Sequence, residues 1–162
     1  MALLRILTLE NDEEALRRHS RPLDGVNDRT RTLLDDLYET MQEANGVGLA
    51  APQVGVLRRV VVIDVGEGRI DLVNPEIVSA EGEQEDREGC LSVPEECGIV
   101  KRPMKVTVKA LDKNGKPFTL TGEGLLARAL CHEIDHLDGV IYVDKASRML
   151  TPEEMEEYED ED

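Results

Sequence analysis

The pentapeptide His132-Glu133-Ile134-Asp135-His136 has the residue types and the spacing of a hydrolytic metal site. Positions four residues apart share one face of a helix, with Cβ atoms about 5–6 Å apart, so two imidazoles at this spacing can bind one metal ion. The glutamate between them then lies beside the metal, where it can accept and return a proton of water. This interpretation requires a helix and a third metal ligand.

The residues around the pentapeptide have the pattern of a buried helix. Residues 123–137 are rich in leucine and alanine, and Asp138-Gly139 can end a helix. The pentapeptide is therefore predicted to lie in the last main helix, in the buried setting that its chemistry requires.

The earlier elements follow from hydrophobic periodicity. A helix over residues 27–44 is predicted because its apolar side chains share one face and Asn45-Gly46 can end it. Asn11 begins a capping-box pattern that predicts a short helix. Strands are predicted over residues 58–65, 70–73, 76–78, 105–111, 117–120 and 142–143. This order predicts an α+β fold in which mainly antiparallel sheets pack around the central helix that carries the HExxH motif.

The composition indicates an acidic protein that is not expected to bind nucleic acid directly. The chain has 162 residues and a formal net charge of −16, and it lacks the clustered Lys and Arg that phosphate contacts need. One Phe, three Tyr and no Trp offer no platform for base stacking. No segment approaches the roughly 20 apolar residues of a membrane span, and residues 1–9 lack a signal-peptide cleavage site. Three cysteines without an export signal argue against a disulfide framework.

The third metal ligand is not expected to be a histidine. His19 lies among arginines, which disfavours metal binding. The longer metalloprotease signature requires a histidine where this chain has Tyr142. A glutamate from residues 153–161 would need apolar neighbours to bring it back to the core, and that run has none.

A cysteine ligand remains. Cys131 points about 100° away from His132 on a helix, so it cannot easily share the metal. Cys97 lies in a polar context, whereas Cys90 follows a glycine that allows close approach of the backbone. One cysteine and two histidines leave a coordination position open for water, which is typical of catalytic zinc sites.

Three segments of the chain resemble the signature blocks of the peptide deformylases. They are Gly46-Val47-Gly48-Leu49-Ala50-Ala51-Pro52-Gln53, Glu88-Gly89-Cys90-Leu91-Ser92 and His132-Glu133-Ile134-Asp135-His136-Leu137-Asp138-Gly139. They occur in the family's order with similar separations, and the resemblance extends from about residue 3 to about residue 148. The chain is most similar to the compact bacterial type, because long insertions are lacking.

The resemblance implies a metal centre and a proton-transfer group. Cys90, His132 and His136 would bind the metal, and Glu133 would act as general base and then as general acid. One thiolate and two imidazoles suit Fe(II), Zn, Ni or Co. The resemblance implies Fe(II) in the cell.

The resemblance also implies how a substrate would be held. The Leu91 backbone N–H and the Gln53 side-chain amide would stabilise an oxyanion, and Gly48 would contact the substrate backbone. An apolar cleft for a methionine side chain is expected from Val47, Leu125 and Ala129. The family removes the formyl group from N-formylmethionyl peptides and releases formate, so the expected substrates are nascent proteins in the bacterial cytoplasm.

Three other functions make different predictions. A structural zinc module would add a fourth protein ligand and would not depend on Glu133. A metallopeptidase would cleave unformylated peptides. A protein that only binds formylated peptides would show no turnover.

The end of the chain departs from the compact bacterial type. We expect a single catalytic domain over residues 1–150 and an acidic tail over residues 151–162, which holds eight of the thirty-five acidic residues. Relatives of this type often end in a basic helix linked to ribosome contact. The acidic tail would be repelled by RNA phosphates, so ribosome contact is expected to be transient and weak or differently placed.

Overall fold

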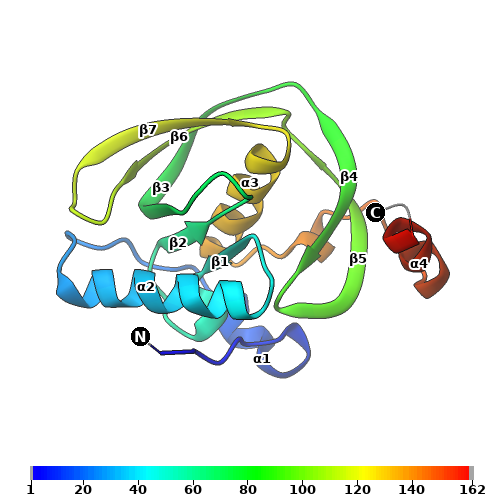
Figure 1. Ribbon diagram of the computed structural model, residues 1–162, viewed down its shortest axis with the longest axis horizontal. Helices are drawn as coiled ribbons and strands as arrows, with labels where there is room; N and C mark the ends of the chain where they lie inside the picture. Colours follow the sequence, from blue (N-terminus) through cyan, green and yellow to red (C-terminus); the bar gives the residue numbers. More distant parts are fainter. Residues whose placement is uncertain (1, 161–162) are drawn as a thin grey trace.

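The apolar helix that carries the pentapeptide lies at the centre of the fold (Figure 1). The computed structural model describes residues 2–160, and this helix is α3, Leu125–Leu137. The other helices are α1 (Leu9–Leu16), α2 (Asp28–Glu43), α4 (Pro152–Asp160) and the 3-10 segments η1 (Ala51–Val54) and η2 (Tyr142–Asp144).

The strands form two antiparallel sheets. The first has the order β1-β2-β3-β6-β7, and its strands are Gly48–Ala50, Val60–Ile63, Ile70–Glu81, Lys105–Leu111 and Pro117–Glu123. The second has the order β4-β5-β8, with strands Gln84–Cys90, Val93–Arg102 and Arg148–Met149. Strands β1 and β4 are therefore edge strands of different sheets.

Apolar burial places α3 against the first sheet. Leu130 and Ile134 of α3 belong to one buried cluster with Val61, Val106 and Val108 of the sheet. The continuous apolar run of β2 is fully buried, as its sequence predicts. Because the sheet holds one side of α3, the polar side chains of the helix face a different part of the molecule.

Helix α2 covers the same sheet near β1 and β2. The Asn27 side chain accepts a hydrogen bond from the Thr30 backbone N–H at 3.1 Å, which caps the first turn. Leu34, Leu37 and Met41 are buried in a cluster with residues of β1 and β2. This helix confirms the range predicted from periodicity.

The α+β architecture and its central helix confirm the predicted fold class, although several element boundaries differ: β2 is shorter than predicted, β7 is longer, and β3 and α1 differ more. The strands predicted on either side of Asn74-Pro75 are one strand, β3, because the chain passes this point as a β-bulge. Asn74 has a positive φ of 52° and both ends of its side-chain amide bond to Leu23, which stabilises the bulge. Helix α1 begins at Leu9, because Thr8 rather than Asn11 is its N-cap.

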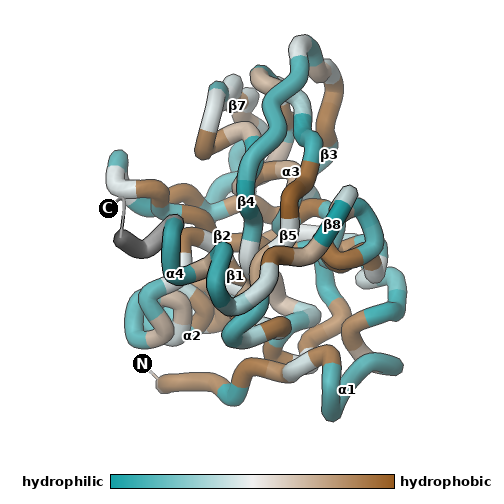
Figure 2. The backbone as a smooth tube through the Cα atoms, turned by 90° about the vertical axis from the view of Figure 1, so that its right-hand side faces the viewer, coloured by the Kyte–Doolittle hydropathy of each residue, from teal (hydrophilic) through white to brown (hydrophobic). Residues whose placement is uncertain are grey.

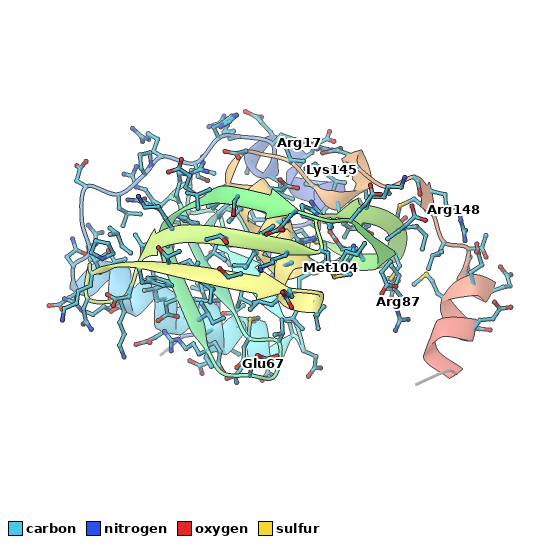
Figure 3. All side chains as sticks on the ribbon, turned by 90° about the horizontal axis from the view of Figure 1, so that it is seen from above. Arg17, Glu67, Arg87, Met104, Lys145 and Arg148 are labelled. Carbon is cyan, nitrogen blue, oxygen red and sulfur yellow. The ribbon has the colours of Figure 1, made fainter. Side chains whose placement is uncertain are left out.

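Several elements differ in kind from the prediction, and the short strands β1 and β8 are not part of it. Tyr142 and Val143 lie in the 3-10 segment η2 and not in a strand. Strands β4 and β5 have no counterpart in the prediction, because their sequences lack the apolar alternation of a half-buried strand; Figure 2 shows β4 as mainly hydrophilic. Residues 152–160 of the expected tail form α4, at the edge of the molecule (Figure 1), and residues 161–162 lie outside the described part.

Candidate active site

A cavity of about 480 Å³ opens where β1, β4 and α3 meet. Its wall is made by residues 45–48, 53, 87–91 and 93–96 and by residues of α3 between Leu125 and Glu133. The wall contains every residue to which the sequence analysis assigned a role except His136. Segments that are far apart in the sequence therefore converge on one space.

Cys90, His132 and His136 bring three potential metal ligands together. The ligand atoms lie within 4.8 Å of one another, and Cys90 Sγ is 3.2 Å from His136 Nε2. Cys90 ends β4, and the histidines lie one turn apart on the buried face of α3. A thiolate with two imidazoles is a donor set for a divalent transition metal, so these residues fit a metal ion.

Glu88 fixes the orientation of His132. The Glu88 carboxylate lies 2.5 Å from His132 Nδ1, and it also accepts hydrogen bonds from Arg102 and Arg128. Asp135 binds the other side of Arg102 at 2.7 Å. Because Glu88 accepts the Nδ1–H, the Nε2 lone pair of His132 is left for a metal.

The buried network shifts the pKa values of its members. Burial alone would raise the pKa of Glu88, but hydrogen bonds from His132 and Arg102 hold it at about 2. Burial opposes the charged form of His132, yet neighbouring Glu133, Cys90 and Glu88 raise its pKa. The pKa of His136 is lowered by burial and by the nearby charge of His132. Metal ligation requires both histidines to be neutral, so His136 is already in the binding form, whereas a metal ion would displace the proton that the acidic neighbours favour on His132.

Glu133 lies on the cavity wall with a perturbed pKa. It is 4% exposed, and burial raises its pKa to about 7, which suits a group that must both accept and donate a proton. Within residues 2–160, its Oε1 is buried without a hydrogen-bond partner. A Cβ on Gly48 would lie 2.6 Å from Glu133 Oε2, so Gly48 leaves the space that this carboxylate occupies.

Gln53 and Leu91 both lie beside Cys90. The Gln53 side-chain nitrogen is 3.6 Å from Cys90 Sγ, and Leu91 follows Cys90 in the turn between β4 and β5. A Cβ on Gly46 would lie 2.7 Å from Leu91 Cδ1, so residue 46 must be small to let its loop pack on this turn. Gln53 and Leu91 therefore both border the cavity next to Cys90.

The three apolar residues assigned to a methionine cleft also lie on the cavity wall. Val47 and Leu125 are 44% and 54% exposed and lie at its rim, whereas Ala129 is buried. The remaining candidates lie elsewhere: Cys131 belongs to the apolar core, Cys97 is half-buried on β5, and His19 is exposed.

The sequence analysis gave no role to Glu88, Arg102, Arg128 or Ser92. Two signals could have found part of this set. Glu88 precedes Cys90 by two residues and so shares its face of a strand, and Arg128 precedes His132 by four residues on the helix. Ser92 lies in the same signature block as Cys90, which could have singled it out, whereas Arg102 lies outside the three blocks.

The chain matches the polypeptide deformylase family model over residues 3–151. The chain belongs to the peptide deformylase family. The peptide deformylase of Acetivibrio thermocellus is 59% identical over 147 residues, which cover 91% of this chain and 86% of that protein. The peptide deformylase of Caldicellulosiruptor bescii is 59% identical over 97% of this chain and 93% of its own length.

Solved structures of the family have the same fold. The peptide deformylase of Legionella pneumophila superposes with a TM-score of 0.85 at 46% identity, covering 98% of this chain and 96% of that one. The peptide deformylase of Ehrlichia chaffeensis, in complex with actinonin, has a TM-score of 0.87 at 34% identity, covering 100% and 99%.

Family membership establishes the reaction. This peptide deformylase is a metal-dependent hydrolase that removes the N-formyl group from the N-terminal methionine of newly synthesised proteins and releases formate. Peptide deformylases use a single divalent metal ion, which agrees with the three converging ligands. No helix among residues 2–160 is long and apolar enough to cross a membrane.

Proposed function

We propose that Cys90, His132 and His136 hold the metal of this deformylase and that Glu133 transfers the proton during hydrolysis. The supporting observation is the convergence of the three ligand atoms beside the buried Glu133 carboxylate, in a cavity that opens to solvent. When bound, a divalent ion there supplies Lewis acidity, which acidifies water and polarises a carbonyl group.

The residues of the chain complete the hydrolysis of the formamide. Glu133 accepts a proton from the attacking water and returns it to the leaving amine, because its raised pKa allows both steps. The Gln53 side-chain amide and the Leu91 N–H donate hydrogen bonds to the oxyanion that forms. Loss of one such donor typically costs about 2.7–4 kcal/mol in other enzymes.

Two edge strands hold the peptide substrate. Strands β1 and β4 end their sheets and both border the cavity, so an extended peptide can pair with either edge. Gly48 contacts the peptide backbone, and Val47, Leu125 and Ala129 line the cleft for the methionine side chain. Actinonin, which binds the Ehrlichia chaffeensis relative, is expected to compete with formyl peptide for this cavity.

The metal in the cell is proposed to be Fe(II). A thiolate and two imidazoles also bind Zn, Ni and Co, so the donor set alone does not decide. Metal analysis after anaerobic purification should find about one iron per chain. Exposure to air should release iron and oxidise Cys90, which mass spectrometry of the tryptic peptide would detect. Zinc in the anaerobic protein would contradict the proposal.

The reaction is proposed to occur in the bacterial cytoplasm on nascent chains, with only transient ribosome contact. The tail contains α4, which begins with acidic residues and has no basic residue in its last turn. Cosedimentation with ribosomes at low salt should be weak, and it should not weaken further when residues 151–162 are removed. Tight binding that depends on this tail would contradict the proposal.

The direct test is formate release from formyl-Met-Ala-Ser by anaerobically prepared Fe(II) or Ni(II) protein. Glu133→Ala should bind about one metal ion per chain yet lose about 10²–10⁴-fold in kcat. Glu76→Ala, which removes an exposed carboxylate on β3, is the matched control and should keep full activity. Full activity of Glu133→Ala would refute the proposed role.

The alternative functions have less support. A structural zinc site needs a fourth protein ligand, and among residues 2–160 the group of converging ligands contains Cys90, His132 and His136 alone. A peptidase would release amino acids from unformylated Met-Ala-Ser, which we expect this protein to leave intact. A protein that only binds formyl peptides would show no formate release.

A further inference from the structure

The side chain of Gln53 is held by polar contacts at both ends of its amide. Its Oε1 accepts a hydrogen bond from the Ala50 N–H at 2.9 Å, and its Nε2 donates to Ser92 Oγ at 3.1 Å. Gln53 is 1% exposed and Ser92 is fully buried. Because only the amide oxygen can accept from a backbone N–H, these contacts determine which end of the amide faces Ser92.

Ser92 also determines where the second amide hydrogen points. A side-chain amide nitrogen carries two hydrogens in the plane of the group. One is donated to Ser92 Oγ, and the same nitrogen also donates to Cys90 Sγ, 3.6 Å away on the cavity wall, so the second hydrogen points into the site. Without the Ser92 hydroxyl, the Ala50 N–H would still hold the amide oxygen, but the amide nitrogen would lose the contact that fixes the direction of its second hydrogen.

We propose that Ser92 is a positioning residue that orients the Gln53 amide toward the reacting carbonyl group. The proposal rests on the proposed role of Gln53 as an oxyanion donor. Ser92 itself does not touch the substrate. It acts through Gln53, because donors to an oxyanion are effective only when they are already aimed at the place where the charge develops.

The N-terminal segment supports this arrangement from the outer side. The Leu7 N–H donates to the Gln53 carbonyl oxygen at 2.7 Å, and the Leu9 N–H donates to the Ser92 carbonyl oxygen at 2.8 Å. Leu7 is buried in the cluster that includes Val93, so the segment is anchored beside the β4–β5 turn. Gln53 and Ser92 are therefore connected twice, by their side chains and by the backbone of residues 7–9.

The backbone bond between Leu9 and Ser92 also bears on the second proposed oxyanion donor, the Leu91 N–H. Leu91 immediately precedes Ser92, so the position of its N–H follows the backbone that Leu9 holds. We therefore infer that residues 7–9, although outside the cavity, fix the separation between the two oxyanion donors.

The first test is a double-mutant cycle on Ser92 and Gln53, measured with formyl-Met-Ala-Ser. Gln53→Ala should lower kcat about 10²–10³-fold. Ser92→Ala should lower kcat roughly tenfold, in line with the loss of one buried hydrogen bond, and should leave KM within about twofold. The double variant should be no slower than Gln53→Ala, because Ser92 has no role once Gln53 is gone.

Other outcomes of this cycle have distinct meanings. If Gln53→Ala keeps full kcat, the proposed oxyanion role of Gln53 is wrong and the inference fails with it. If Gln53→Ala is slow but Ser92→Ala is not, only the positioning role is wrong. Effects that multiply in the double variant would show a general structural role for Ser92 and would also overturn the inference. Ser147→Ala, which removes a hydroxyl bonded to a β5 carbonyl at 3.3 Å outside the cavity wall, is the matched control.

The second test removes one backbone donor and does not depend on the Ser92 variants folding. Leu9 is the first residue of α1, where proline is tolerated, and Thr8 before it is extended, as a residue before proline must be. Leu9→Pro deletes the N–H that bonds Ser92, whereas Leu9→Ala shortens the side chain and keeps this donor. Leu9→Pro should have a kcat several-fold below that of Leu9→Ala at similar KM. Equal kcat values would contradict the role of residues 7–9.

Discussion

Helices α2 and α3 pack on the same sheet, but their buried residues differ in kind. Helix α2 buries leucine, methionine and threonine, and none of its charged residues is among its buried residues. Helix α3 buries ten of its thirteen residues, including Arg128, His132, Glu133 and His136. Burial of apolar side chains alone accounts for the position of α2. Polar groups on α3 would destabilise the fold unless other elements supplied partners for them.

The partners of α3 come from the second sheet. Glu88 of β4 lies at 2.8 Å from Arg128, and Arg102 of β5 connects Glu88 to Asp135. Lys145, after η2, binds Asp135 at 3.0 Å and extends this network to the surface. The first sheet and α2 therefore stabilise the fold by apolar burial, whereas the second sheet supplies the partners that allow a charged helix to be buried.

The largest loss of stability should come from Glu88→Gln, which removes the negative charge that Arg102, Arg128 and His132 share. Three cationic or polar partners then lie buried without their carboxylate, and loss of one member of a buried ion pair typically costs about 3–5 kcal/mol. Metal affinity should also fall about 10–100-fold, because His132 loses the acceptor that orients it. Urea unfolding and metal titration would measure the two effects. A variant with unchanged stability and metal affinity would show that the network does not support α3.

The next largest effect should be Leu37→Ala on α2, and it should affect stability alone. Leu37 is fully buried, and such truncations typically cost about 2–5 kcal/mol. Because α2 supplies no metal ligand, kcat per folded molecule should remain at the wild-type value at 15 °C. Urea unfolding and formate release on the same preparation would check this. A lower kcat in fully folded protein would break the distinction between the two helices.

A smaller effect is expected from Gly48→Ala, and it should be confined to the chemistry of α3. The added methyl group would displace the Glu133 carboxylate, from which an ideal Cβ is only 2.6 Å away. Misplacement of a catalytic group by about 1 Å can cost about 100-fold, so kcat should fall about 10–100-fold while the metal is retained. Gly25→Ala is the matched control, because nothing lies within 4 Å of its Cβ. Equal kcat values for the two variants would show that Glu133 has room to move.

The same difference explains which parts could be predicted from the sequence. Helix α2, strand β2 and the hairpin of β6 and β7 bury apolar side chains with a clear period, and the prediction found them. Strand β4 reads Gln-Glu-Asp-Arg-Glu-Gly-Cys, and its inward-facing Glu88 is stabilised by arginines that are distant in sequence. Periodicity cannot detect a strand whose buried face is ionic. The motif residues could be proposed from the sequence, whereas the place of Arg102 and the bond between Ser92 and Gln53 depend on contacts that only the fold creates.

The smallest effect should be Asp35→Asn on α2, which is the exposed counterpart of Glu88→Gln. Asp35 lies 2.8 Å from Arg69, the distance that also separates Glu88 from Arg128, but the Asp35 side chain is 48% exposed. Water screens such pairs, so the variant should lose less than about 1 kcal/mol of unfolding free energy. This loss should vanish in about 1 M NaCl, where the Debye length is about 3 Å, whereas the loss in Glu88→Gln should persist. Urea unfolding of both variants at low and high salt makes the comparison. A salt-resistant loss in Asp35→Asn would mean that distance, and not burial, determines how strongly a carboxylate–arginine pair stabilises this fold.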